Sequence, residues 1–134
     1  PQQGEIVDAF IISPAQVLEL LFHAPKQAPE YAQVYGKVPT PEDLETAERN
    51  REMAVRLCWK PYMYDPRLAS LLGRVHIPTR IIWGRQDRIV PLECGRLYNK
   101  AIPGSELVVI DRCGHVPQME KPEEFLRLAQ DFLT

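Results

Sequence analysis

Hydrophobic residues follow a helical spacing in the first part of the chain. Three runs place apolar side chains three or four positions apart, and each run follows a Ser, Thr or Asp and then a Pro, the usual order at a helix start. The spacing predicts helices over residues 13–22, 40–57 and 65–72. The stretches 25–39 and 59–64 lack this spacing and are predicted as loops.

The second part of the chain carries short, continuous apolar runs instead. Residues 78–83 and 106–110 are rich in β-branched and other apolar side chains and are followed by polar or turn-forming residues. Helical spacing returns over residues 91–101 and 122–133. Continuous hydrophobicity favours parallel strands that are buried on both faces. The sequence therefore predicts a β-α-β-α unit of the α/β class.

The predicted sheet is too small to form a complete fold. Two parallel strands leave open edges and too little core to be stable alone. The 134-residue chain opens with Pro1 rather than Met, and we therefore expect it to be part of a longer protein. Within it we expect two regions, a helical segment over residues 1–73 and the β-α-β-α unit over residues 74–134.

Composition and charge narrow the classes of function. The formal net charge is −2 and the basic residues are spread along the chain, which disfavours nucleic acid and anionic membranes as partners. No stretch is long and apolar enough to span a bilayer. The three cysteines form no CxxC pair and the three histidines show no ligand spacing. We therefore expect no disulfide framework, no metal, no other cofactor and a cytoplasmic location.

Two polar loops follow the predicted strands and carry the candidate chemistry. Asp87 follows the first strand and His115 follows the second. Functional groups in open α/β sheets lie on loops at the carboxyl ends of the strands, so both side chains are expected at one edge. An imidazole transfers protons near neutral pH, and a carboxylate bonded to its second nitrogen fixes its tautomer. A turn-forming Asp and an ordinary loop His are the alternatives.

The nucleophile that such a pair would serve is not found in this sequence. No Gly-x-Ser-x-Gly string occurs. The serines fall at a predicted helix cap, on a helix surface and in a turn (Ser13, Ser70 and Ser105). In such triads the nucleophile comes before the acid and the histidine in chain order. A chain that holds the acid and the base but not the nucleophile therefore fits the second half of a triad enzyme.

Several motifs in sequence order resemble the α/β-hydrolase family. Residues 78–91 are similar to the segment around the triad acid, residues 102–115 to the last strand and histidine loop, and residues 120–125 to the start of the final helix. The resemblance implies that Asp87 and His115 are the catalytic acid and base. It also implies a partial α/β-hydrolase fold, with a helical cap followed by the last two parallel strands and their helices.

Residues 1–73 fall where this family inserts its helical cap, which supplies part of the substrate pocket. The resemblance makes aromatic residues of this segment, and the residue after the histidine, candidates for substrate contact. They are Trp59, Tyr62, Tyr64 and Val116, with Tyr31 and Tyr35 as further candidates. Packing within the cap is the alternative for the aromatic side chains.

Within the family the chain is most similar to small-molecule esterases and meta-cleavage-product C–C hydrolases. The C–C hydrolases usually carry Trp directly after the catalytic His, where this chain has Val116. We therefore predict hydrolysis of an ester or related acyl compound through a Ser-His-Asp triad. An epoxide hydrolase or haloalkane dehalogenase with an Asp nucleophile is one alternative, and in an epoxide hydrolase Tyr62 or Tyr64 would be the acid. A non-catalytic ligand-binding relative is another.

The resemblance also implies the partners. They are a small-molecule substrate and the N-terminal half of the same hydrolase, which would supply the nucleophile and the oxyanion hole. The 134-residue chain is therefore predicted to be inactive by itself. The remaining alternative is an interaction fragment whose open sheet edge pairs with another chain or with a second copy in a homodimer.

Overall fold

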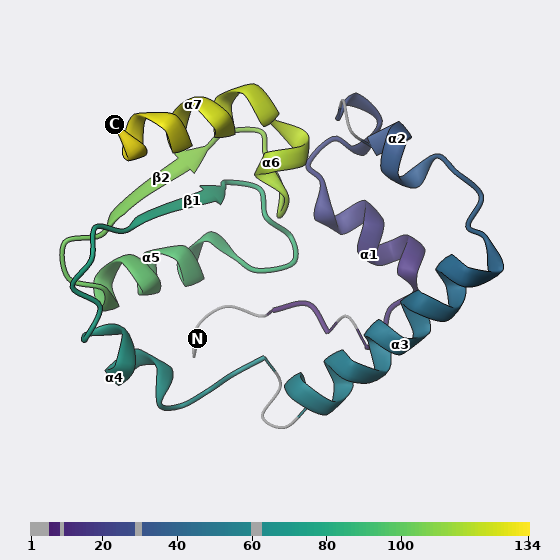
Figure 1. Cartoon of the computed structure of the whole chain (residues 1–134), viewed down its shortest axis with the longest axis horizontal. Coiled ribbons are helices and arrows are strands. Elements are labelled where there is room, and N and C mark those ends of the chain that lie inside the picture. The colour runs from purple at the N-terminus through teal and green to yellow at the C-terminus, as the bar shows by residue number, and fades with distance from the viewer. Residues whose placement is uncertain (1–5, 9, 29–30, 60–62) are drawn as a thin grey trace.

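The computed structural model describes residues 6–8, 10–28, 31–59 and 63–134. Helices occupy the first part of the chain, and two strands with their helices occupy the second (Figure 1). This arrangement matches the predicted α/β class. In chain order the elements are α1 (Pro14–Leu21), η1 (Pro25–Gln27), α2 (Tyr31–Tyr35), α3 (Pro41–Cys58), α4 (Leu68–Leu72), β1 (Arg80–Gly84), α5 (Leu92–Ala101), β2 (Glu106–Ile110), α6 (Pro117–Glu120) and α7 (Pro122–Leu133).

Capping boxes start the two longest helices of the first part, as the sequence predicted for their N-termini. The Ser13 hydroxyl accepts the backbone N–H of Gln16, whose side chain accepts the N–H of Ser13 in return. Thr40 and Asp43 make the same reciprocal pair at the start of α3. Each box satisfies amide groups that have no partner inside the helix, so local sequence alone is enough to fix where these helices begin.

The stretch 25–39 was predicted as a loop, and this prediction was wrong because it contains η1 and α2. Tyr31 and Tyr35 of α2 pack edge-on against the ring of Phe22, with centroids 5.4 and 5.9 Å apart. Phe22 is fully buried. The short helix is therefore stabilised by packing on one aromatic ring, which the spacing of its own residues does not reveal.

Other helix starts also differ from the prediction. α4 begins at Leu68 rather than at residue 65, because the Asp65 carboxylate accepts the N–H of Arg67 (2.9 Å) in a turn. α5 begins one residue later than predicted, with Pro91 as its N-cap. The single turn of α6 was not predicted.

β1 and β2 pair in parallel, as predicted, with Arg80 opposite Glu106 and Gly84 opposite Ile110. α5 lies along one face of this sheet and α7 along the other (Figure 1). The central residues of both strands are only half-buried, although they were expected to be buried on both faces. Two strands with one helix on each face do not cover this much apolar surface, which is the physical reason for the difference.

Specific contacts attach each helix to the sheet. Gly95 allows α5 to approach β1 closely, because a Cβ at this position would lie 2.9 Å from the Trp83 ring. On the other face, Arg80 donates to the Leu128 carbonyl of α7 (2.7 Å) and stacks over the Phe132 ring. Fully buried residues gather near the carboxyl end of the sheet and include Ile110 and Cys113. This end of the sheet therefore provides a rigid base for the loops that follow the strands.

No helix within the described ranges combines the length and the apolar character that a bilayer crossing requires.

Candidate active site

Asp87 and His115 meet at the carboxyl ends of the two strands. The Nδ1 atom of His115 lies 2.8 Å from Oδ2 of Asp87. The Asp87 side chain is 3% exposed, whereas the His115 side chain is 35% exposed. Because a carboxylate can only accept a hydrogen bond, this geometry assigns the proton of a neutral imidazole to Nδ1 and leaves Nε2 as its free acceptor. The two side chains therefore lie together at one edge of the sheet, as expected from the sequence.

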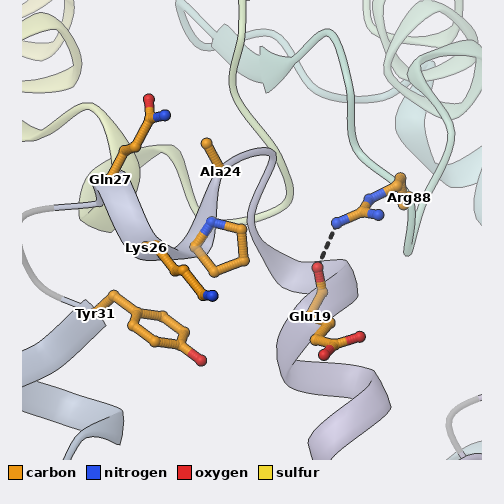
Figure 2. Close-up of a pocket in the computed structure, with 7 residues that line it drawn as sticks. Glu19, Ala24, Lys26, Gln27, Tyr31 and Arg88 are labelled. Atoms are coloured by element: carbon orange, nitrogen blue, oxygen red, sulfur yellow. Dashed lines mark hydrogen bonds between the residues drawn. The ribbon is translucent and has the colours of Figure 1, made fainter.

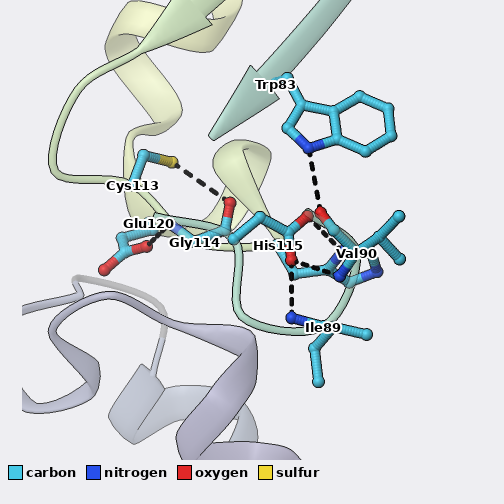
Figure 3. A network of polar contacts seen from close by, with 8 residues as sticks. Trp83, Ile89, Val90, Cys113, Gly114, His115 and Glu120 are labelled. Carbon is cyan, nitrogen blue, oxygen red and sulfur yellow. Dashed lines mark hydrogen bonds and ion pairs between the residues drawn. The ribbon is translucent and has the colours of Figure 1, made fainter. Parts of the chain in front are cut away.

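The second oxygen of Asp87 organises its own loop. Oδ1 accepts the backbone N–H of Ile89 (2.9 Å) and that of Val90 (2.8 Å), two residues that are labelled in Figure 3. The Val90 carbonyl in turn accepts from the indole N–H of Trp83 (3.2 Å). Asp87 is therefore a turn former as well as the partner of His115, so the two roles that the sequence offered as alternatives coexist.

Backbone contacts hold the two loops against each other. Gln86 donates its N–H to the Cys113 carbonyl (2.9 Å), and its side-chain oxygen accepts the Cys113 N–H (3.1 Å). Arg85 and Asp111 add an ion pair at the surface. The close contact between the two loops requires glycine at position 84. A Cβ there would lie 2.5 Å from the Cys113 carbonyl oxygen and would overlap the Gly114 carbonyl oxygen. The loops are thus fixed as one unit, and the Asp87–His115 distance is set with them.

Serines and buried cysteines of the described residues are engaged in structural roles. The hydroxyls of Ser13, Ser70 and Ser105 each bond within their own cap, helix or turn, which agrees with the roles expected for them. Burial raises the pKa of the Cys113 thiol to about 12, and the nearby Glu120 carboxylate contributes to the increase. Burial also raises the pKa of Cys94. Because the thiolate is the reactive form, neither buried thiol is an activated nucleophile.

The predicted pocket residues lie in different places. Trp59 is about half-exposed, and its ring lies 6.0 Å from that of Phe10. Tyr64 lines an open hollow of about 520 Å³ between the end of α3 and the start of α4. Tyr62 lies outside the described residues. Val116 is half-buried and precedes α6. The structure brings none of the described aromatic candidates into a hollow with His115, and their role in substrate binding stays a prediction.

A second hollow of about 390 Å³ lies beside the end of α1 and is drawn in Figure 2. Its walls combine apolar surface with charged side chains, and Arg88 reaches across it to the backbone carbonyl of Glu19. Its lining residues are Glu19, Ala24, Pro25, Lys26, Gln27, Tyr31 and Arg88. Neither this hollow nor the first contains Asp87 or His115. Among the described residues no group of three His, Cys, Asp or Glu side chains is placed to hold a metal ion.

Glu120 is a buried polar residue near the site that sequence reasoning did not single out. It is 6% exposed, and its carboxylate accepts the Gly114 N–H directly before His115 (2.6 Å). Its signals in the sequence are its place at the start of the 120–125 motif and its position between Pro117 and Pro122, which restrict the helix that carries it to one turn.

Comparison with known protein families identifies the fold that carries these two residues. Residues 21–122, which include both Asp87 and His115, match the family described as the alpha/beta hydrolase fold. This chain belongs to the α/β-hydrolase fold family. The resemblance inferred from the loop motifs is confirmed, and the β1-α5-β2 unit with its two loops is a part of the α/β-hydrolase fold.

Known α/β-hydrolases similar to this chain act on small organic molecules. The 2-hydroxy-6-oxononadienedioate/2-hydroxy-6-oxononatrienedioate hydrolase 2 of Pseudomonas putida is 46% identical over 68 residues, which are 51% of this chain and 24% of that relative. Hence the match spans about a quarter of the length of the curated relative.

Two solved structures of α/β-hydrolases resemble the fold over more of the chain. The 2-hydroxy-6-oxo-6-phenylhexa-2,4-dienoate hydrolase of Rhodococcus sp. strain RHA1 has a TM-score of 0.63 over 88% of this chain and 42% of its own, and its 24% identity indicates likeness of fold alone. A serine hydrolase involved in carbazole degradation has a TM-score of 0.57 at 27% identity, over 70% of this chain and 35% of its own.

Proposed function

We propose that the full-length protein hydrolyses an ester or a related acyl compound of small size through a Ser-His-Asp triad. Asp87 and His115 of this chain are its acid and base, and the serine lies outside this chain. The observation that carries the proposal is the 2.8 Å contact between a buried carboxylate and a partly exposed imidazole at the end of a parallel sheet. The similar serine hydrolase of carbazole degradation supports serine as the nucleophile.

The proposed proton path runs through these two residues. Nε2 of His115 accepts the serine proton as the serine oxygen attacks the carbonyl carbon, and Asp87 stabilises the imidazolium through Nδ1. The imidazolium then gives the proton to the leaving alcohol, which leaves an acyl-serine. Water attacks this ester in the second half, with His115 again taking the proton and returning it to serine. Every step needs an imidazole whose Nδ1 side is held, as it is here by Asp87.

The test compares His115→Ala and Asp87→Asn with the wild type in the full-length protein. In Asp87→Asn the amide oxygen can keep accepting from Ile89 and Val90, so the loop should stay folded. The amide nitrogen then faces His115 and can only donate, which forces the proton of the imidazole onto Nε2. We expect kcat to fall by about 10⁴-fold with little loss of stability.

Asp131→Asn is the matched control, because Asp131 lies on α7 away from both loops, is 58% exposed and pairs only with Arg127 among the described ion pairs. It should keep turnover of p-nitrophenyl esters close to wild type. Turnover that survives both His115→Ala and Asp87→Asn would overturn the triad. Ester turnover by the 134-residue chain alone, lost on His115→Ala, would overturn the external nucleophile. Tight substrate binding without turnover by the full-length protein would favour a ligand-binding relative.

Cleavage of a carbon–carbon bond beside a ketone is the second candidate reaction. It is favoured by the 46% identity to the Pseudomonas putida hydrolase over 68 residues. Both reactions use the same Asp87–His115 pair, so substrate preference and not the triad distinguishes them. Full-length protein should be given a p-nitrophenyl ester and 2-hydroxy-6-oxononadienedioate in parallel. A kcat/KM that is higher for the ester supports the first candidate, and the reverse order supports the second.

A further inference from the structure

Glu120 is a buried carboxylate with no cationic partner among the ion pairs of the described residues. It is 6% exposed, although Glu is rarely buried unless it is paired. Burial of a charged group is costly unless hydrogen bonds replace its water. The position of this residue therefore requires a structural explanation.

Three backbone amides replace water around this carboxylate. Oε1 accepts the N–H of Ala24 (2.7 Å), and Oε2 accepts those of His23 (3.0 Å) and Gly114 (2.6 Å). Figure 3 shows Glu120 directed at the backbone beside His115. Two of the amides belong to the segment after α1, and the third belongs to the histidine loop. A single side chain therefore joins two parts of the chain that are about ninety residues apart in sequence.

The two peptide groups directly before His115 are each held through their N–H. Glu120 binds the N–H of Gly114, and the Leu21 carbonyl accepts the N–H of His115 at 2.7 Å. The two segments touch closely, because a Cβ at Gly114 would lie 2.5 Å from the Leu21 oxygen and 2.8 Å from the His23 nitrogen. With the backbone fixed in this way, the imidazole has little freedom to move away from Asp87.

We propose that Glu120 is a positioning residue for His115, which clamps the histidine loop to residues 21–24 so that Nδ1 stays in contact with Asp87. This role rests on the proposed function, in which His115 is the base. In the hydrogen bonds of the described residues the Glu120 carboxylate accepts from backbone amides, and it has no part in proton transfer. Its loss should therefore change the orientation and tautomer of the imidazole rather than the chemistry of the reaction.

Glu120→Gln in the full-length protein is the variant that tests the clamp. The shape of the side chain is kept, but the amide nitrogen cannot accept a hydrogen bond, so at least one of the three backbone amides loses its partner. We expect kcat per folded molecule to fall by up to about 100-fold, with KM little changed. In ¹⁵N-histidine NMR, His115 should change from the Nδ1–H form to a mixture with the Nε2–H form.

Two control variants separate positioning from general stability. Glu123→Gln removes an exposed carboxylate from α7 and should change none of these measurements. Arg80→Gln removes contacts to Glu106 and Leu128 at the amino end of the sheet, so it should weaken the fold without altering the His115 tautomer. Chemical denaturation gives the folded fraction by which each kcat is normalised.

The outcomes are distinct. A Glu120→Gln protein with wild-type kcat and a pure Nδ1–H tautomer would overturn the clamp while leaving the triad intact. Equal changes in kcat and tautomer in Arg80→Gln would also overturn it, because the effect would then follow stability alone. If His115→Ala keeps full activity, the proposed function fails, and the positioning role fails with it.

Discussion

Gly84→Ala is the most direct test of how the Asp87 and His115 loops are held together. Gly84 ends β1 and is buried between the loops. A Cβ at this position would lie 2.5 Å from the Cys113 carbonyl oxygen and 2.8 Å from the Cys113 carbonyl carbon. Real Cβ atoms do not approach other atoms closer than 3.0 Å, so Cys113 must retreat by at least 3.0 − 2.5 = 0.5 Å. The Gly114 carbonyl must move farther still.

This displacement acts on the residues that precede His115. The Gln86–Cys113 hydrogen bonds would stretch, and Nδ1 of His115 would leave its 2.8 Å contact with Asp87. Overpacking of this kind costs about 1–3 kcal/mol of stability. A misplacement of about 1 Å in a catalytic group can lower the rate by about 100-fold. We therefore expect both the free energy of unfolding and kcat to decrease in the full-length protein.

Gly73→Ala is the matched control for this substitution. Gly73 follows α4 with a right-handed backbone (φ −62°), and the nearest atoms to a Cβ there lie at 3.7 Å, which is ordinary contact. Alanine should be tolerated and should stabilise by about 0.4–1 kcal/mol, because it restricts the unfolded chain. Urea unfolding and ester turnover measure both variants. Wild-type stability and kcat in Gly84→Ala would refute the claim that close backbone contact sets the geometry.

Two further predictions concern thiol reactivity and helix stability. Because burial raises the pKa of Cys113 to about 12, its thiol stays protonated at neutral pH, and iodoacetamide should modify the half-buried Cys58 first. Mass spectrometry of native protein measures this, and equal labelling of both residues would contradict it. The Thr40 hydroxyl and N–H hold the pKa of Asp43 below its usual range. The folded-state pKa is depressed, so this stabilisation is present above about pH 4 and is lost as the pH falls through the folded value. Asp43→Asn should therefore reduce helical circular dichroism at neutral pH, but not at a pH low enough to protonate Asp43 in the folded state; an equal loss at both would argue against the capping box.

Local signals explain which parts of the fold were predictable. The starts of α1 and α3 follow from Ser13 and Thr40, each with its Pro and its reciprocal partner three residues on. The strands follow from continuous apolar runs, and the meeting of Asp87 with His115 follows from parallel pairing, which brings both carboxyl ends to one edge.

Features that depend on distant contacts were not predictable in this way. α2 packs against Phe22, and the sequence of its own five residues does not predict that contact. The burial of Glu120 depends on amides of His23 and Ala24, which are nearly a hundred residues away in sequence. The two hollows likewise arise where separate segments meet, so sequence motifs could name pocket candidates but could not place them.

The divided bonding of Asp87 has a consequence for protein engineering. One carboxylate oxygen builds the turn with Ile89 and Val90, and the other orients the imidazole. An aspartate grafted alone onto another scaffold would lack the turn that aims it. The smallest transferable module is therefore the whole segment from Asp87 to Val90, together with a histidine loop in register beside it.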